Sequence, residues 1–309
     1  MAIDDNTLVI GVSSRALFDL EKENEVFRNK GIDAYRKYQL EKEDVPLKPG
    51  TAFPLIRNLL LLNSLVEKPL VEVVVMSKNS PETGIRMLNS IRKMDLNITR
   101  IALSGGTSLA PYIEGFRVDL FLSKDEKDVQ DIIDFKSCAA GLIYNPPGNI
   151  FEFDENEVRL AFDADAVIFS EESELRYKKE GLASFIQHES ENEKIPLSKG
   201  PFADLLKKLS GMQKVLNENM DKSPLRLAIV TARSAPSHMR VINTLREWGV
   251  VVDEAYFLGG LAKDQILKAF GAHIFFDDQE VHLDSSSMVV PAAKVPYPKD
   301  SEINKMINN

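Results

Sequence analysis

The sequence predicts an α/β fold made of two copies of one unit, each with its own parallel sheet. Short apolar runs alternate with longer amphipathic stretches along the whole chain, which is typical of consecutive strand–helix–strand units. Glycine, proline, arginine and asparagine positions of the first half recur 150 to 154 residues later. Such matches go beyond shared periodicity, so they indicate an internal duplication.

The composition is that of a soluble globular chain with two domains. Of its 309 residues, 44% are hydrophobic and 28% are charged, which is enough for two cores. The net charge is −9 without a long basic run, which argues against a nucleic-acid partner. No apolar stretch approaches the ~20 residues that span a bilayer, and the acidic N-terminus does not resemble a signal peptide. We therefore expect no membrane partner and a cytoplasmic location, which the single cysteine also fits.

Ten short apolar runs are expected to form the strands, and amphipathic stretches between them the helices. The expected strands are residues 8–12, 71–76, 100–103, 120–122 and 141–144 in the first copy, and 158–162, 225–230, 255–257, 273–276 and 294–295 in the second. The expected helices include residues 81–94, 203–216, 237–248 and 263–270. Ligands of parallel sheets lie at the carboxyl ends of the strands. The charged, mostly helical insert at residues 171–223 is therefore expected to cover that end of the second copy as a cap.

The duplication is visible in individual residues. Matched pairs are Gly31 and Gly181, Pro46 and Pro196, Gly50 and Gly200, Arg86 and Arg240, and Asn89 and Asn243. A segment rich in proline and glycine at residues 146–148 marks the boundary between the copies. The predicted domains are therefore residues 1–148 and residues 149–309.

Four carboxylates follow strands of the second copy. Asp163 and Asp165 end one apolar run, and the strand period of two places their side chains on the same side. Close carboxylates repel unless a cation holds them or one keeps a proton. A hard divalent cation with oxygen ligands suits this pair, and Asp277 and Asp278 at the end of another run can supply further ligands.

A hydroxyl and an ammonium group complete a site that suits a phosphoryl group: Thr231 ends a strand, and Lys263 follows in the next interval. Each part alone has a simpler explanation. Two aspartates at a strand end often form a solvated turn, a threonine there usually caps a helix, and a lysine is usually a surface charge. The occurrence of all four parts in order favours a catalytic site.

The first copy lacks these side chains. The catalytic positions of the second copy align with Ser13, Arg15, Ser77, Leu109, Ser123 and Lys124. We therefore expect chemistry only in the second copy. The polar group Ser13, Ser14 and Arg15 has two interpretations: it binds a phosphate or sugar hydroxyl of the substrate, or it caps a helix.

The order of these parts resembles the haloacid dehalogenase superfamily of aspartate-nucleophile phosphatases. More specifically, the cytosolic type I 5′-nucleotidases and their bacterial relatives resemble this chain from about residue 8 to residue 297, in the segments VSSRALFDLEKE, AYRKYQLE, PGTAFP, LNSI, AFDADAVIFSEESE, VTARSAPS and FFDDQEVH. The resemblance implies two Rossmann-like lobes of that superfamily, the first non-catalytic and the second with a cap. It also implies cytosolic proteins, some of which form homo-oligomers. One departure is Ala164, where some relatives have glycine.

The resemblance implies magnesium-dependent hydrolysis of nucleoside 5′-monophosphates, such as AMP, IMP or deoxy and pyrimidine counterparts, to nucleoside and phosphate. Asp163 is then the expected nucleophile, which forms an aspartyl phosphate. Asp165 is expected to protonate the leaving oxygen and to activate water. Thr231 and Lys263 are expected to stabilise the phosphoryl oxygens. The expected Mg²⁺ ligands are Asp163, the backbone carbonyl of Asp165, and one or both of Asp277 and Asp278.

Residues that enter the cap or follow the threonine are expected to bind the substrate, and they are Phe169, Ser170, Glu172, Arg233 and Ser234. Each has the alternative of a helix cap or an ion pair. Two other functions remain open: a phosphatase for sugar phosphates or other small phosphomonoesters, and a nucleotide-binding regulator without turnover. The complete catalytic set argues against the regulator, because binding alone does not require a nucleophile and an acid.

Overall fold

The computed structural model describes residues 6–148, 154–218 and 220–307. The expected strands are all present within these residues. In the first copy they are β1 (Leu8–Ser13), β4 (Val71–Ser77), β5 (Arg100–Leu103), β6 (Leu120–Ser123) and β7 (Ala139–Ile143). In the second copy they are β8 (Val158–Phe162), β9 (Leu225–Thr231), β10 (Glu254–Phe257), β11 (Ile274–Asp277) and β12 (Ala292–Lys294). A small separate sheet pairs β2 (Phe18–Asp19) with β3 (Lys48–Pro49). The predicted α/β class is confirmed.

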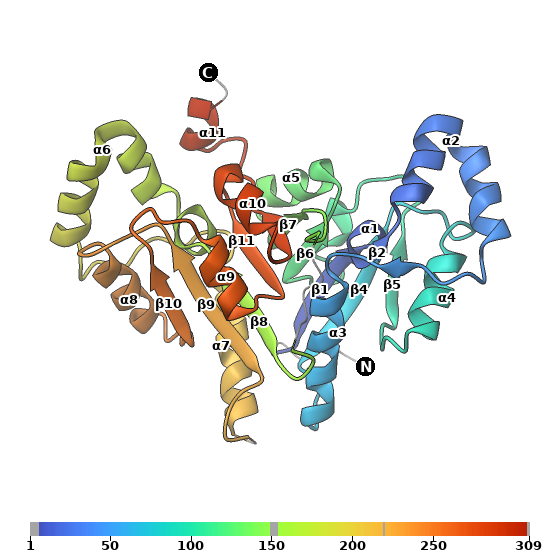
Figure 1. The fold of residues 1–309 in the computed structure, drawn as a ribbon, viewed down its shortest axis with the longest axis horizontal. Helices are drawn as coiled ribbons and strands as arrows, with labels where there is room; N and C mark the ends of the chain where they lie inside the picture. The colour runs from blue at the N-terminus through green and yellow to red at the C-terminus, as the bar shows by residue number, and fades with distance from the viewer. Residues whose placement is uncertain (1–5, 149–153, 219, 308–309) are drawn as a thin grey trace.

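The two copies share one ten-stranded sheet, in the order β10-β9-β8-β11-β12-β7-β6-β1-β4-β5 (Figure 1). Read outward from the centre, the order of equivalent strands is the same in both halves. The pair β12–β7 at the centre is antiparallel, whereas the other strand pairs of this sheet are parallel among the described residues. The strands therefore reverse direction at the centre, and the carboxyl ends of the two halves do not form one continuous edge.

Helices lie on both faces of the sheet and beyond its edges (Figure 1). In the first copy they are α1 (Ser14–Leu17), α2 (Glu21–Glu41), α3 (Phe53–Leu61), η1 (Leu62–Leu65), α4 (Ile85–Lys93), η2 (Ala110–Tyr112) and α5 (Glu126–Asp134). In the second copy they are η3 (Ala164–Ile168), α6 (Glu172–Glu191), α7 (Ala203–Asn217), α8 (His238–Glu247), α9 (Asp264–Phe270), α10 (Glu280–Ser286) and α11 (Glu302–Ile307). None of the helices within the described residues combines the length and hydrophobicity needed to cross a bilayer.

The two faces of the sheet bury their apolar side chains differently. Alternate residues of each strand point to opposite faces. On one face, strand residues such as Ile10 and Phe276 join α3 and α7 in a single core that runs through both copies. On the other face there are two separate cores, one around Phe121 in the first copy and one around Phe275 in the second. The copies are therefore joined through a shared hydrophobic layer as well as through the strands.

The residues that matched in the sequence make equivalent hydrogen bonds in the two copies. Arg86 donates from Nε to the carbonyl of Val45 at 2.9 Å, and Arg240 donates in the same way to Ile195 at 2.9 Å. The matched asparagines do likewise, Asn89 to Glu43 and Asn243 to Glu193. These bonds tie α4 and α8 to the turns that follow α2 and α6, which explains why the matched residues recur.

The long helices α2 and α6 rise from the sheet at the upper right and upper left of Figure 1. Each is broken at its matched glycine, because Gly31 has a φ of 79° and Gly181 a φ of 80°, a region that L side chains rarely adopt. Of the insert expected at residues 171–223, α6 projects in this way. The helix α7 instead packs on the sheet, where Leu206 and Leu209 are fully buried.

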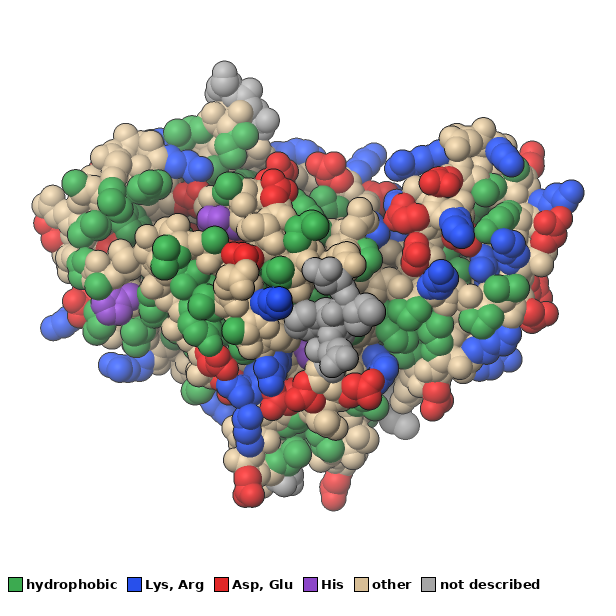
Figure 2. Space-filling model, in the orientation of Figure 1, with side chains coloured by type: hydrophobic (Ala, Val, Ile, Leu, Met, Phe, Trp, Pro, Cys, Tyr) green, Lys and Arg blue, Asp and Glu red, His purple; other side chains and the backbone are tan. Residues whose placement is uncertain are grey.

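The outer surface carries both signs of charge. On the face drawn in Figure 2, lysine and arginine side chains are interspersed with aspartate and glutamate. This mixture is evident over α2, which contains ion pairs such as Arg36 with Asp33 and Lys37 with Glu41.

Candidate active site

The predicted catalytic residues meet at the carboxyl ends of three neighbouring strands of the second copy. β8 lies between β9 and β11, and these strands end at Phe162, Thr231 and Asp277. Asp163 follows β8 directly, and its backbone N–H donates to the carbonyl of Phe276 at 2.8 Å. The parallel register thus brings side chains more than 100 residues apart to one point.

Three buried aspartates form a compact cluster. Oxygen atoms of Asp163, Asp277 and Asp278 all lie within 4.8 Å of one another. The ammonium of Lys263, which lies directly before α9, donates to Asp163 Oδ1 at 2.5 Å and to Asp277 Oδ2 at 2.7 Å. Lys263 is itself only 1% exposed. Thus one buried cation reaches two buried carboxylates of the cluster.

Burial sets the protonation of the cluster. It raises the pKa of Asp163 to about 7, although the Lys263 ammonium acts in the opposite direction. Burial also raises the pKa of Asp278 well above its usual value, with the charges of Glu174 and Asp277 adding to the effect. For Asp277 the effect of burial is outweighed by Lys263 and His282, which hold its pKa below the usual value. Ionising all three of these close carboxylates is energetically unfavourable unless further positive charge is present.

The cluster suits an oxygen-liganded metal ion. Asp278 accepts a hydrogen bond from the Tyr297 hydroxyl at Oδ2, while its buried Oδ1 has no hydrogen-bond partner among the described residues. A buried carboxylate oxygen without a donor is costly, and a divalent cation bound by several carboxylates would satisfy it. Asp163, Asp277 and Asp278 can therefore hold a metal, whereas the side chain of Asp165 lies outside this cluster.

Asp165 is held by an arginine instead. The guanidinium of Arg233 donates to both oxygens of its carboxylate, at 2.8 and 2.6 Å. The same guanidinium pairs with Glu189 of α6, which is 1% exposed and also accepts from Arg240 at 2.9 Å and Ser173 at 3.0 Å. These charges raise the pKa of Arg233, so it remains a cation despite its burial. Thr231 is also buried, and its hydroxyl accepts the backbone N–H of Arg233 at 3.2 Å.

The helix α6 lies close to the aspartate cluster through a second contact. Glu174 accepts from Gln279 at 3.0 Å, and Lys178 lies 3.0 Å from the same carboxylate. Sequence reasoning did not single out Glu174, Glu189 or Tyr297. Signals for two of them existed, because Glu189 aligns with Gln39 of the first copy and Tyr297 aligns with Tyr144 in the segment that repeats residues 139–146.

The residues expected to bind substrate in the second copy fall in different surroundings. The ring of Phe169 is fully buried and packs against Trp248, with ring centres 5.5 Å apart. Glu172 is exposed and lies 3.6 Å from His188, and Ser234 is exposed. Ser170 lines a cavity of about 690 Å³ between the two copies, beside Tyr297. The structure therefore places Arg233, but not Phe169 or Glu172, in contact with a predicted catalytic side chain.

Ser13, Ser14 and Arg15 belong to a separate cavity of the first copy, and the aspartates of the second copy do not line it. Ser13 caps α1 by accepting the backbone N–H of Ala16 at 3.2 Å, which is one of the two interpretations that the sequence left open. Ser14 lies 3.0 Å from the hydroxyl of Ser77. The other interpretation, binding of a phosphate or a sugar hydroxyl, is still possible for a ligand that enters this cavity of the first copy.

Comparison with known proteins agrees with this geometry. Cytosolic 5′-nucleotidase 1B of Homo sapiens is 34% identical over 303 residues, which cover 95% of this chain and 49% of that protein. This chain thus spans about half the length of that relative. No solved structure matches this chain. The sequence profile described as 5′-nucleotidase matches residues 1–302, so the chain belongs to the 5′-nucleotidase family.

Proposed function

We propose that this protein is a phosphoric monoester hydrolase that converts nucleoside 5′-monophosphates to nucleoside and phosphate. The observation that carries the proposal is the buried group of Asp163, Asp277, Asp278 and Lys263 at neighbouring strand ends. Such a group offers a nucleophile, a metal site and a cation for phosphoryl oxygens. The family supports the nucleotide as substrate. The name of the human relative supports a cytosolic location. The formation of a homo-oligomer remains a prediction.

In this mechanism Asp163 attacks phosphorus in line with the leaving 5′ oxygen. A bond forms between Asp163 and phosphorus as the bond to the 5′ oxygen breaks, which gives an aspartyl phosphate. Asp165 gives a proton to the departing nucleoside oxygen. Water then attacks phosphorus and returns a proton to Asp165, which releases phosphate and regenerates the Asp163 carboxylate.

The other residues of the site position these two groups. Lys263, 2.5 Å from Asp163, neutralises charge near the phosphoryl oxygens, and Thr231 is proposed to donate to one of them. Arg233 orients Asp165 through two hydrogen bonds. A site dry enough to bury Lys263 makes each of these interactions stronger than in water.

Magnesium fits the cluster best among common cations, because the donor set is entirely carboxylate oxygen. Asp163, Asp277 and Asp278 would hold it, with the backbone carbonyl of Asp165. It would supply the positive charge that lets an anionic carboxylate approach an anionic phosphate. The residues proposed to meet the nucleoside are Ser170, which lines the cavity of about 690 Å³ beside Tyr297, and Ser234.

A panel of phosphomonoesters tests the proposal. Phosphate release is measured for nucleoside monophosphates and sugar phosphates, with magnesium and with EDTA, and the Asp163→Asn variant serves as the blank. We expect the highest kcat/KM for a nucleoside monophosphate. Faster turnover of sugar phosphates than of nucleoside monophosphates would show that sugar phosphates are the substrate class. Saturable nucleotide binding without phosphate release at any magnesium concentration would instead identify a regulator.

A further inference from the structure

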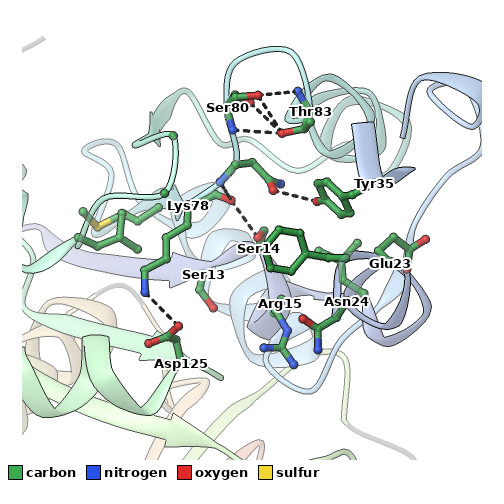
Figure 3. Close-up of a pocket in the computed structure, with 18 of the residues that line it drawn as sticks. Ser13, Ser14, Arg15, Glu23, Asn24, Tyr35, Lys78, Ser80, Thr83 and Asp125 are labelled. Atoms are coloured by element: carbon green, nitrogen blue, oxygen red, sulfur yellow. Dashed lines mark hydrogen bonds and ion pairs between the residues drawn. The ribbon is translucent and has the colours of Figure 1, made fainter. Parts of the chain in front are cut away.

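The first copy has kept a cavity where its own active site would have been. Its volume is about 460 Å³, within the usual range for small-molecule sites. Ser13, Ser77 and Ser123 line it from the ends of β1, β4 and β6, and α2 residues such as Tyr35 and Asn24 form one side of it (Figure 3). These three serines occupy the positions of Asp163, Thr231 and Asp277 in the second copy. The cavity and the aspartate cluster are therefore equivalent places in the two halves.

The floor of this cavity has hydroxyl groups in place of the carboxylates. Replacing Asp163 and Asp277 with serines removes the negative charge that a divalent cation would balance. The hydroxyls of Ser14 and Ser77, which lie 3.0 Å apart, can donate to an anion. A phosphate group can therefore bind here without a metal. The hydroxyl of Ser13 carries no negative charge, so it cannot replace the Asp163 carboxylate as a nucleophile.

Two cations stand beside these hydroxyls. The ammonium of Lys78 lies 3.0 Å from Asp125 and 3.0 Å from Asp128. These two partners leave Lys78 charged, because they raise its pKa above the usual value against the effect of burial. The guanidinium of Arg15 reaches Glu21 at 3.3 Å, but its Nε is buried without a hydrogen-bond partner. Figure 3 shows Lys78 and Arg15 on either side of Ser13.

On the cavity wall that α2 forms, Glu23 is already neutralised, because it accepts from Arg86 at 2.6 Å. That wall also carries two aromatic rings, beside Asn24, Ile32 and Arg36. Phe27 is 47% exposed and packs edge-on against Tyr35, whose hydroxyl donates to Asn79 at 2.8 Å. An exposed aromatic ring at a cavity suits a planar base. The cavity thus has a polar end, where Lys78 and Arg15 lie with their carboxylate partners, and an end that includes two aromatic rings.

We propose that the first copy binds a nucleoside phosphate in this cavity, without a metal ion and without hydrolysing it. The phosphate lies against Ser13, Ser77 and Arg15, and the base lies against Phe27. The existence of this site is independent of the proposed function. The choice of a nucleoside as the apolar part rests partly on that function, since the two copies share one ancestral site.

Calorimetric titration of the Asp163→Asn protein with AMP in EDTA tests this proposal, because chelation removes the metal and the substitution prevents turnover. We expect saturable binding at one site per chain. Arg15→Gln and Phe27→Ala, each added to Asp163→Asn, should weaken it at least about tenfold. Arg28→Gln, a change on α2 at an exposed arginine outside the cavity lining, should alter the affinity less than about twofold. Phe27 is exposed, so its variant should fold even if the Arg15 variant does not.

Two results would overturn the proposal. One is the absence of saturable binding of AMP, ADP and inorganic phosphate in EDTA. The other is AMP binding that neither Arg15→Gln nor Phe27→Ala weakens, which would place the nucleotide in the second copy. Phosphate release by the wild-type protein separates this inference from the proposed function. An inactive wild type with Arg15-dependent binding would overturn only the function, and an active wild type without such binding would overturn only this inference.

Discussion

Arg233 donates two hydrogen bonds to Asp165, from Nε to Oδ2 at 2.8 Å and from Nη2 to Oδ1 at 2.6 Å. The third nitrogen of the same guanidinium pairs with Glu189 of α6. Arg233 therefore links the proposed acid–base residue to the helix that projects beside the site. A planar, two-pronged contact of this kind fixes the plane of a carboxylate as well as its distance.

The geometry predicts that Arg233→Lys lowers kcat by about 10²-fold or more, because an ammonium cannot reproduce the fork that orients Asp165. KM should change much less, since Asp165 acts on the leaving oxygen. Steady-state kinetics with AMP measure both constants. Arg240→Lys is the matched control, because Arg240 also contacts Glu189 but does not reach Asp165. Wild-type kcat in the Arg233→Lys enzyme would contradict the positioning role.

Asp163→Asn is expected to lower kcat at least about 10⁴-fold while the fold survives. An amide is nearly isosteric with the carboxylate but is a poor nucleophile. Burial of the Asp163 carboxylate is costly, as the rise of its pKa to about 7 shows, so Tm should be unchanged or higher. Circular dichroism melting and phosphate release are measured on the same preparation. Substantial residual turnover would mean that another group attacks phosphorus.

The strands could be predicted from the sequence because buried parallel strands appear as short apolar runs with polar ends. The reversal at β7–β12 could not, since that pair is short and its direction depends on how the two halves pack. The helix α7 was assigned to the cap because an amphipathic pattern shows that one face is buried but not against which layer.

The catalytic residues were predictable because each one follows a strand, and parallel strands end together. Side-chain partners were not. Asp165 and Arg233 are 68 residues apart, and Arg233 could equally have paired with a phosphate. For Ser13, Ser14 and Arg15 the sequence left substrate binding and a helix cap open, and it could not show that the reversal of strand direction gives the first copy its own edge and its own cavity.

Mg²⁺ is expected to raise Tm, because an ion that binds only the folded protein stabilises it by mass action. The increase should be about 2.7 kcal/mol of unfolding free energy at a concentration 100 times the dissociation constant. Asp278→Asn should abolish most of it, since Asp278 has a buried oxygen without a partner. Asp300→Asn, at an exposed aspartate, should not. Full phosphatase activity in EDTA would refute the metal requirement.

The contact between Asn58 and His273 predicts a dependence of stability on pH. Asn58 of α3 lies 3.0 Å from His273 Nε2 and also donates to the carbonyls of Asp154 and Glu157. The other ring nitrogen of His273 accepts the backbone N–H of Arg159 at 3.2 Å, so that nitrogen carries no proton. Burial, and to a lesser extent Arg159, lowers the pKa of His273 to about 4.

Since an unfolded histidine titrates near 6.5, the unfolded chain binds more protons than the folded one between pH 4 and 6.5. This histidine therefore contributes stability that is complete above pH 6.5 and is lost as the pH falls towards 4, up to about 3 kcal/mol. Urea unfolding at several pH values measures the slope. His273→Asn should flatten it by that amount, whereas His238→Asn, at a half-buried ring beside Phe257, should keep it. An unchanged slope in His273→Asn would show that the pKa of this histidine is the same in the folded and the unfolded protein.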